Sequence, residues 1–251
     1  MHDLGPLVGG IDSEGNAIND SGVIVGDVFV AANHSHGFEL AGSTFTDIGT
    51  LTGGVNSQAT GISPSGLITG DADTASTTEA IIYTNGSGLK DIGTLGGSFA
   101  EGQGINNAGQ VAGSSAISGN AATHAFLYTG GTMMDLGTLG GSNSSGLGIN
   151  ASGWVVGASD VAGGAQHAFV YINGVMLDLN SLLASNLGVT LSAAFAVNDS
   201  GQILAVGSNA TTDFSFLLTP VPEPSSLLLL ALGIASLVLV SRHDKKRGTC
   251  D

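Results

Sequence analysis

Histidine and aspartate are the residues of this chain whose types and spacing could do chemistry. His34 and His36 are two positions apart, so a strand would place both imidazoles on one face, as metal ligands often lie. His124 and His167 stand in the same local context as His36. A histidine that recurs in this way is better explained as a structural residue that hydrogen-bonds a neighbouring strand or loop.

A second candidate is the carboxylate pair Asp71 and Asp73, whose oxygens are the ligand type that Ca²⁺ prefers. Counted from Asp71, the fifth position is Ala75 and the twelfth is Ile82, so the segment lacks the ligands of an EF-hand loop. We therefore predict no metal site and no cofactor, and Ca²⁺ at this pair is the alternative.

No residue is predicted to be catalytic. The one cysteine, Cys250, lies in the C-terminal tail, and no serine stands in the context of a nucleophile elbow. An aspartate recurs along the chain, which is typical of a packing or turn device in a repeat protein. Its positions are Asp3, Asp47, Asp91, Asp135 and Asp178.

The charge of the chain excludes some ligand classes. Residues 1–220 contain 17 acidic residues and a single basic one, Lys90. A nucleic-acid binder needs a cationic surface, and arginine is the usual partner of carboxylates and phosphates. We therefore predict no nucleic-acid partner and no anionic ligand for this region.

The recurring aspartates are 44, 44, 44 and 43 residues apart, which indicates a repeat architecture. The sequence of each repeat predicts a hairpin around an Asn/Ser-x-x-Gly turn, followed by a third strand and then a fourth strand that carries the aspartate. The five turns are Asn19–Gly22, Ser63–Gly66, Asn106–Gly109, Asn150–Gly153 and Asn198–Gly201.

Four short strands in about 44 residues match one blade of a β-propeller. We predict an all-β domain over residues 1–218, a five-bladed propeller of four-stranded blades, with an open β-solenoid as the alternative. Prolines after residue 218 argue against a fourth strand in the last repeat. The N-terminal segment Asp3–Leu7 is predicted to supply that strand by pairing with Phe214–Leu218.

The strands His124-Ala125-Phe126 and His167-Ala168-Phe169, together with the Asp-Leu-Gly-Thr-Leu and Gly-Ile-Asn elements, resemble the HAF-type repeats of bacterial extracellular proteins. The first repeat has His-Gly-Phe instead, and the second and fifth repeats lack the histidine. The resemblance implies an exported protein and no particular activity.

The repeat ends in a tail of three parts. Residues 219–226 are predicted to form a proline-rich linker, 227–241 a transmembrane helix and 242–251 a basic cytoplasmic tail. The apolar run 227–240 would span about 21 Å as a helix, short of the ~30 Å hydrocarbon core. A marginal anchor suits a sorting signal that is later cut.

This tail resembles the PEP-CTERM sorting signal of Gram-negative bacteria. The motif residues are Pro222, Glu223 and Pro224, and the basic cluster is Arg242, Lys245, Lys246 and Arg247. The resemblance implies recognition by an exosortase, transient insertion in the inner membrane, and delivery to the cell surface or extracellular matrix. Such proteins also carry an N-terminal secretory signal, which Met1–Leu7 does not show. We expect the natural start to lie upstream, or the chain to begin after processing.

The sequence thus predicts an exported, non-catalytic repeat protein of the surface or biofilm matrix, with polysaccharide as a candidate ligand. Two alternatives are a propeller-fold glycan hydrolase or lyase and a protein-interaction platform. One Trp, three Tyr and nine Phe weaken the case for a sugar-binding cleft, because such clefts use exposed aromatic rings.

Overall fold

The structure is a computed structural model that describes residues 12–31, 34–183, 188–209, 211–220 and 237–243. Its regular elements are strands, apart from two short 3₁₀ turns, η1 (Ser118–Asn120) and η2 (Leu179–Leu182). Contacts group the chain into two compact units, residues 1–137 and 138–251. The first unit holds three repeats and the second holds two.

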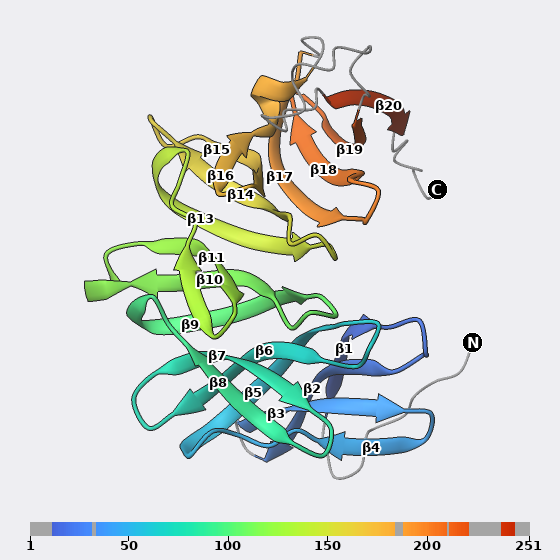
Figure 1. Ribbon diagram of the computed structural model, residues 1–251, viewed down its shortest axis with the longest axis vertical. Helices are drawn as coiled ribbons and strands as arrows, with labels where there is room; N and C mark the ends of the chain where they lie inside the picture. The colour runs from blue at the N-terminus through green and yellow to red at the C-terminus, as the bar shows by residue number, and fades with distance from the viewer. Residues whose placement is uncertain (1–11, 32–33, 184–187, 210, 221–236, 244–251) are drawn as a thin grey trace, which may run out of the picture. The chain divides into compact units, whose positions relative to one another are not determined.

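Each repeat of the first unit is a four-stranded antiparallel sheet whose strands pair in chain order (Figure 1). The repeats are β1 (Ser13–Ile18), β2 (Ile24–Ala31), β3 (His34–Ala41) and β4 (Thr44–Asp47); β5 (Gly53–Ile62), β6 (Ile68–Thr74), β7 (Thr78–Thr84) and β8 (Gly88–Gly93); β9 (Gly96–Ile105), β10 (Val111–Ile117), β11 (Thr123–Thr129) and β12 (Thr132–Asp135). A single parallel bridge, Thr78 with Phe99, joins the second and third sheets. The predicted period of four strands is therefore confirmed in this unit.

The second unit contains the fourth and fifth repeats, again as antiparallel sheets in chain order. Their strands are β13 (Gly140–Ile149), β14 (Val155–Val161), β15 (Gln166–Ile172) and β16 (Val175–Asp178); β17 (Thr190–Val197), β18 (Ile203–Ser208), β19 (Asp213–Pro220) and β20 (Leu237–His243). In β5 and β13 buried positions alternate with partly exposed ones, as in a strand with one covered face. In β10, β11 and β14 several consecutive residues are buried, so both faces of these strands are covered.

The predicted turns form as expected. In the turn after β13, the Asn150 side-chain oxygen accepts hydrogen bonds from the backbone N–H groups of Ser152 and Trp154. Gly153 has a φ of 78°, which a side chain would disfavour. The Asn150 side-chain amide also donates to the Asn198 carbonyl of the next repeat, at 3.1 Å. Asn150 therefore holds both its own turn and the neighbouring one.

Every first strand carries a β-bulge at the same repeat position, where a residue has no partner in the register. The bulged residues are Asn16, Thr60, Gln103, Leu147 and Phe195. A glycine follows the bulge in β5 and β13. A Cβ on Gly61 would lie 2.8 Å from the Gln103 carbonyl oxygen, and one on Gly148 would lie 2.8 Å from that of Phe195. Glycine therefore permits the first strands of successive repeats to approach closely.

The third strands supply the core. Phe38, Phe126 and Phe169 are almost fully buried, and each pairs in register with a glycine of the second strand. A Cβ on Gly113 would lie 2.8 Å from the Phe126 ring. The glycine at this position of the second strand is thus explained by the space that the ring occupies. Truncating such a ring to alanine typically destabilises a protein by about 3–5 kcal/mol.

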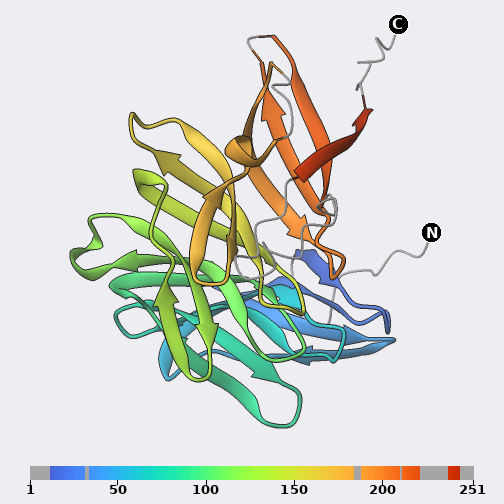
Figure 2. The ribbon, with the colours of Figure 1, turned by 45° about the horizontal axis from the view of Figure 1, so that its top comes forward.

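The described part of the C-terminal region differs from two expectations. The fifth repeat does have a fourth strand of its own, because β20 pairs with β19 from Ser215–His243 to Pro220–Leu237 (the red strand of Figure 2). Residues 237–241, the last part of the predicted segment 227–241, are strand in the structure, and residues 227–236 lie outside the described residues. A Leu/Val-rich run satisfies either state, and here the free edge of β19 offers it a backbone partner.

The edge of β19 that was assigned to Asp3–Leu7 is thus taken by β20. Asp3–Leu7 itself and residues 221–236 lie outside the described residues. In the part of the chain that the structure describes, no helix has the length and hydropathy that a bilayer crossing requires.

The inter-repeat role of Asn150 can be tested against Asn198, whose side chain bonds, among the described residues, only Ser200 and Gln202 of its own turn. We expect Asn150→Ala to lower the free energy of unfolding by about 2–3 kcal/mol and Asn198→Ala by about 1 kcal/mol, because the first also loses a partly buried bond to the next repeat. Urea unfolding measures both. Equal losses would contradict the inter-repeat role.

Candidate functional site

The recurring histidines and aspartates meet as pairs within the repeats. Nδ1 of His36 lies 2.7 Å from Oδ2 of Asp47. The same pairing joins His124 to Asp135 at 2.8 Å and His167 to Asp178 at 2.7 Å. The histidine comes from the third strand and the aspartate from the end of the fourth.

Each of these aspartates has a second role. The other carboxylate oxygen accepts a backbone N–H two residues later, at Gly49, Gly137 and Asn180. The carboxylate therefore closes the turn after the fourth strand and orients the imidazole at the same time. This confirms that the histidines bond a neighbouring strand and that the aspartates are turn devices. In the second repeat Glu79 replaces the histidine and bonds Thr77.

His34 and His36 share strand β3, but only His36 has an aspartate partner, and the buried Nδ1 of His34 has no hydrogen-bond partner. Among the described residues, no group of three or more His, Cys, Asp or Glu side chains is arranged to hold a metal ion.

A group of carboxylates surrounds Asp71 in the first unit. Burial, and then the charges of Glu101, Asp73 and Asp27 in that order, together raise the pKa of Asp71 from 3.8 to about 7. Burial also raises the pKa of Glu101, which a hydrogen bond from Gln103 opposes. Asp27 is buried but accepts bonds from the amides of Asn16 and Gln58. Asp71 is thus the carboxyl of this group that holds a proton near neutral pH.

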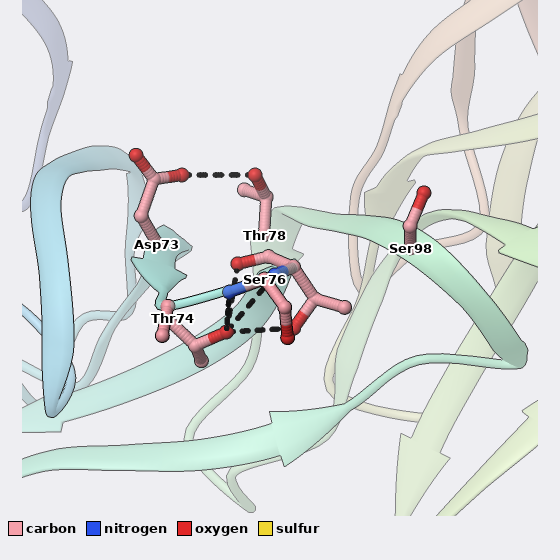
Figure 3. Close-up of a pocket in the computed structure, with 7 residues that line it drawn as sticks. Asp73, Thr74, Ser76, Thr78 and Ser98 are labelled. Atoms are coloured by element: carbon pink, nitrogen blue, oxygen red, sulfur yellow. Dashed lines mark hydrogen bonds between the residues drawn. The ribbon is translucent and has the colours of Figure 1, made fainter.

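Asp73 belongs instead to a polar pocket of about 300 Å³ (Figure 3). Its lining residues are Asp73, Thr74, Ala75, Ser76, Thr77, Thr78 and Ser98. The two oxygens of Asp73 accept bonds from the Thr78 hydroxyl, at 2.9 Å, and the Asn56 amide, at 2.7 Å. Both oxygens of the Asp73 carboxylate therefore already have neutral donors.

Lys90, the single basic residue among residues 1–220, also has a hydrogen-bond partner. Its ammonium donates to the Tyr128 hydroxyl at 2.8 Å and lies 5.2 Å from the centre of that ring. This contact joins the second and third repeats. It was not predicted, although a lone cation in an acidic repeat protein stands out in the sequence.

The predicted sorting residues fall mostly beyond the described chain. Pro222, Glu223 and Pro224 lie outside the described residues, as do Lys245, Lys246 and Arg247. Arg242 lies in β20, where it pairs in register with Phe216. Pro220, just before the motif, ends β19.

Comparison with known proteins supports the reading of this tail. Residues 220–245 match the PEP-CTERM protein-sorting motif. This signal implies an exosortase-sorted extracellular protein whose membrane-anchored precursor is processed to the cell surface. A search of curated proteins finds no match to the chain.

Solved structures resemble the fold of the repeat region. One is the crystal structure of TolB from Acinetobacter baumannii, with 14% sequence identity and a TM-score of 0.52. The match covers 78% of this chain and 49% of the TolB chain, so this chain spans about half the length of that protein. At this identity the likeness bears on the fold alone.

The protonated state of Asp71 predicts how stability depends on pH. Between about pH 4 and pH 7 the unfolded chain has released this proton while the folded chain retains it, so stability falls as the pH rises. We expect Asp71→Asn to remove this fall in stability with rising pH. The melting temperature should change little at pH 4 and should be higher than that of the wild type at pH 8. Each kcal/mol recovered corresponds to about 2–4 °C.

Thermal melts at the two pH values, followed by circular dichroism, measure this effect. Asp20→Asn is the matched control, because Asp20 is exposed and its loss changes the net charge equally. A gain in the control as large as in Asp71→Asn would show that net charge, and not the buried carboxyl, is responsible.

Proposed function

We propose that this chain is an exported repeat protein of the cell surface or extracellular matrix, delivered there by an exosortase and without catalytic activity. The observation that carries the proposal is the PEP-CTERM match over residues 220–245. The acidic body agrees with it, because a high negative charge keeps an extracellular domain soluble.

The finer fold and family belong to the same proposal. The five repeats are blades of a β-propeller, supported by the antiparallel order of four strands in each repeat and by the resemblance to TolB. The His-Ala-Phe strands support membership of the HAF-type repeat proteins. Under this proposal the His–Asp pairs, the turn asparagines and the buried phenylalanines maintain the scaffold, and none of them takes part in a reaction.

Exosortase processing is tested by expressing the chain with a secretory signal in an exosortase-bearing Gram-negative host. We expect the intact mass of the surface fraction to lack residues 242–251. Replacing Pro222, Glu223 and Pro224 with alanine should leave the precursor uncut and membrane-bound, because the recognition motif is lost. Pro64→Ala, in a turn of the body, is the control and should be processed normally. A surface form that retains Arg242–Asp251 would refute the proposal.

A glycan hydrolase is the second candidate, and Asp71 is the observation that favours it. A carboxyl that holds its proton near pH 7 beside a second carboxylate, Glu101, is the pattern of a general acid. The non-catalytic proposal expects no release of reducing ends from surface polysaccharides. Release by the wild type that Asp71→Asn abolishes would establish the hydrolase instead.

A further inference from the structure

Glu39 departs from the repeat at a position that is otherwise apolar. It lies in β3 and pairs in register with Val25. The same position of the other repeats holds aliphatic residues, namely Ile82, Leu127, Val170 and Leu217. Glu39 is nevertheless only 8% exposed. Burying a carboxylate costs free energy, and the other repeats place an aliphatic side chain here. Stability therefore does not explain the presence of Glu39.

The surroundings of Glu39 are built by two repeats of the same unit. Its Oε2 accepts a hydrogen bond of 3.1 Å from the side-chain amide of Asn85, which lies in the turn after β7. Burial, and then the charges of Glu39 and Asp47, raise the pKa of the Tyr83 hydroxyl. The two repeats thus enclose the carboxylate on a face made of turns.

A cavity of about 320 Å³ opens at this carboxylate. Its lining residues are Asn19, Ser21, Val23, Glu39, Pro64, Ser65, Gly66, Leu67, Thr84 and Asn85. Val23, Pro64 and Leu67 give it an apolar wall, and the rest is polar. The volume falls in the range of sites for small ligands.

The polar atoms left over in this cavity are mostly acceptors. Among the described residues, Oε1 of Glu39 and Oδ1 of Asn85 accept no hydrogen bond, and the hydroxyls of Ser21 and Thr84 make none. The cavity lining includes no Lys, Arg or His. A matching ligand therefore brings donors, and a charged donor most of all, since a buried carboxylate pairs best with a cation that hydrogen-bonds it.

We propose that the cavity beside Glu39 binds a saccharide unit that carries a protonated amine, such as an unacetylated hexosamine of a cationic polysaccharide. The ammonium donates to the Glu39 carboxylate, and the ring hydroxyls bond Asn85, Ser21 and Thr84. The apolar face of the sugar ring lies against Leu67 and Pro64. The acidic body attracts such a polymer over a longer range.

This inference deepens the proposed function and rests on it for the polysaccharide setting. Binding by the purified chain needs no exosortase, however. Failure of the binding test therefore leaves the processing test intact, and the reverse is also true.

The test is calorimetric titration of the full-length chain with a glucosamine tetramer at about pH 6, below the usual range of an amine pKa. We expect binding to weaken at least tenfold in Glu39→Leu and in Glu39→Gln. Glu39→Leu installs the residue type of the other repeats and should melt no lower than the wild type. Glu39→Gln keeps the shape of the side chain, so either variant can carry the result.

Glu14→Gln is the matched control, because it removes one exposed carboxylate from the same repeat and should bind as the wild type does. The N-acetylglucosamine tetramer and a galacturonate oligomer should bind at least tenfold more weakly than the glucosamine tetramer. Unchanged affinity in the Glu39 variants, or equal affinity for the acetylated tetramer, would overturn the proposal. If Nα-acetyl-lysine amide bound as tightly as the glucosamine tetramer, the site would be one for a peptide amine, and the saccharide proposal would be overturned.

Discussion

Within each unit the structure depends on the close approach of the first strands of successive repeats. One four-stranded sheet cannot bury its apolar face alone, so each repeat needs the next. The approach is possible because Gly61 and Gly148 leave room for a carbonyl of the next strand, and because a bulge precedes each of them. In the first unit the Thr60 hydroxyl, at the bulge, donates to the carbonyl of Gly102 in the following repeat. A single methyl group at such a glycine would hold the sheets apart.

The turn asparagines add a second connection of the same kind. Asn19 donates from its side chain to the Ser63 carbonyl, as Asn150 does to that of Asn198. The side chain of Asn107 accepts the backbone N–H of Ser65. Residues that define a turn within one repeat therefore also define the distance to the next. An insertion within such a turn would break both functions, whereas the longer connection between Asn150 and Asn198, which are 48 residues apart, leaves the bond intact.

Much of this could be predicted from the sequence, because the repeat shows each local rule several times. The strand order, the turns and the structural role of His36 follow from recurring patterns of Asn, Gly, His and Asp. The strand that pairs with the edge of β19 could not be predicted, because a Leu/Val-rich run has no periodicity that distinguishes strand from helix. The choice depends on a partner strand that is remote in the chain, and here β20 is that partner.

The candidate sites could be predicted least, because they are departures from the repeat. A pattern defines what is shared, whereas Glu39 and Lys90 each occur in one repeat. Aligning the repeats by their register, and not only by their motifs, reveals both residues. Glu39 stands where the other repeats have aliphatic residues, and Lys90 stands where other repeats have Thr46, Met134 and Leu177. Asp71 differs again, because its environment depends on Glu101 and Asp27 of neighbouring repeats. Neither charge is near it in the sequence.

The tail connects the fold to the proposed sorting. β19 ends at Pro220 and β20 begins at Leu237, so the Pro222-Glu223-Pro224 motif lies in the connection between two paired strands. Cleavage in this connection would remove the covalent link that keeps β20 beside β19. Pairing between separate chains carries an entropic cost that pairing within one chain avoids. Under the proposed function, a cut in this connection would therefore also weaken the outer edge of the last sheet.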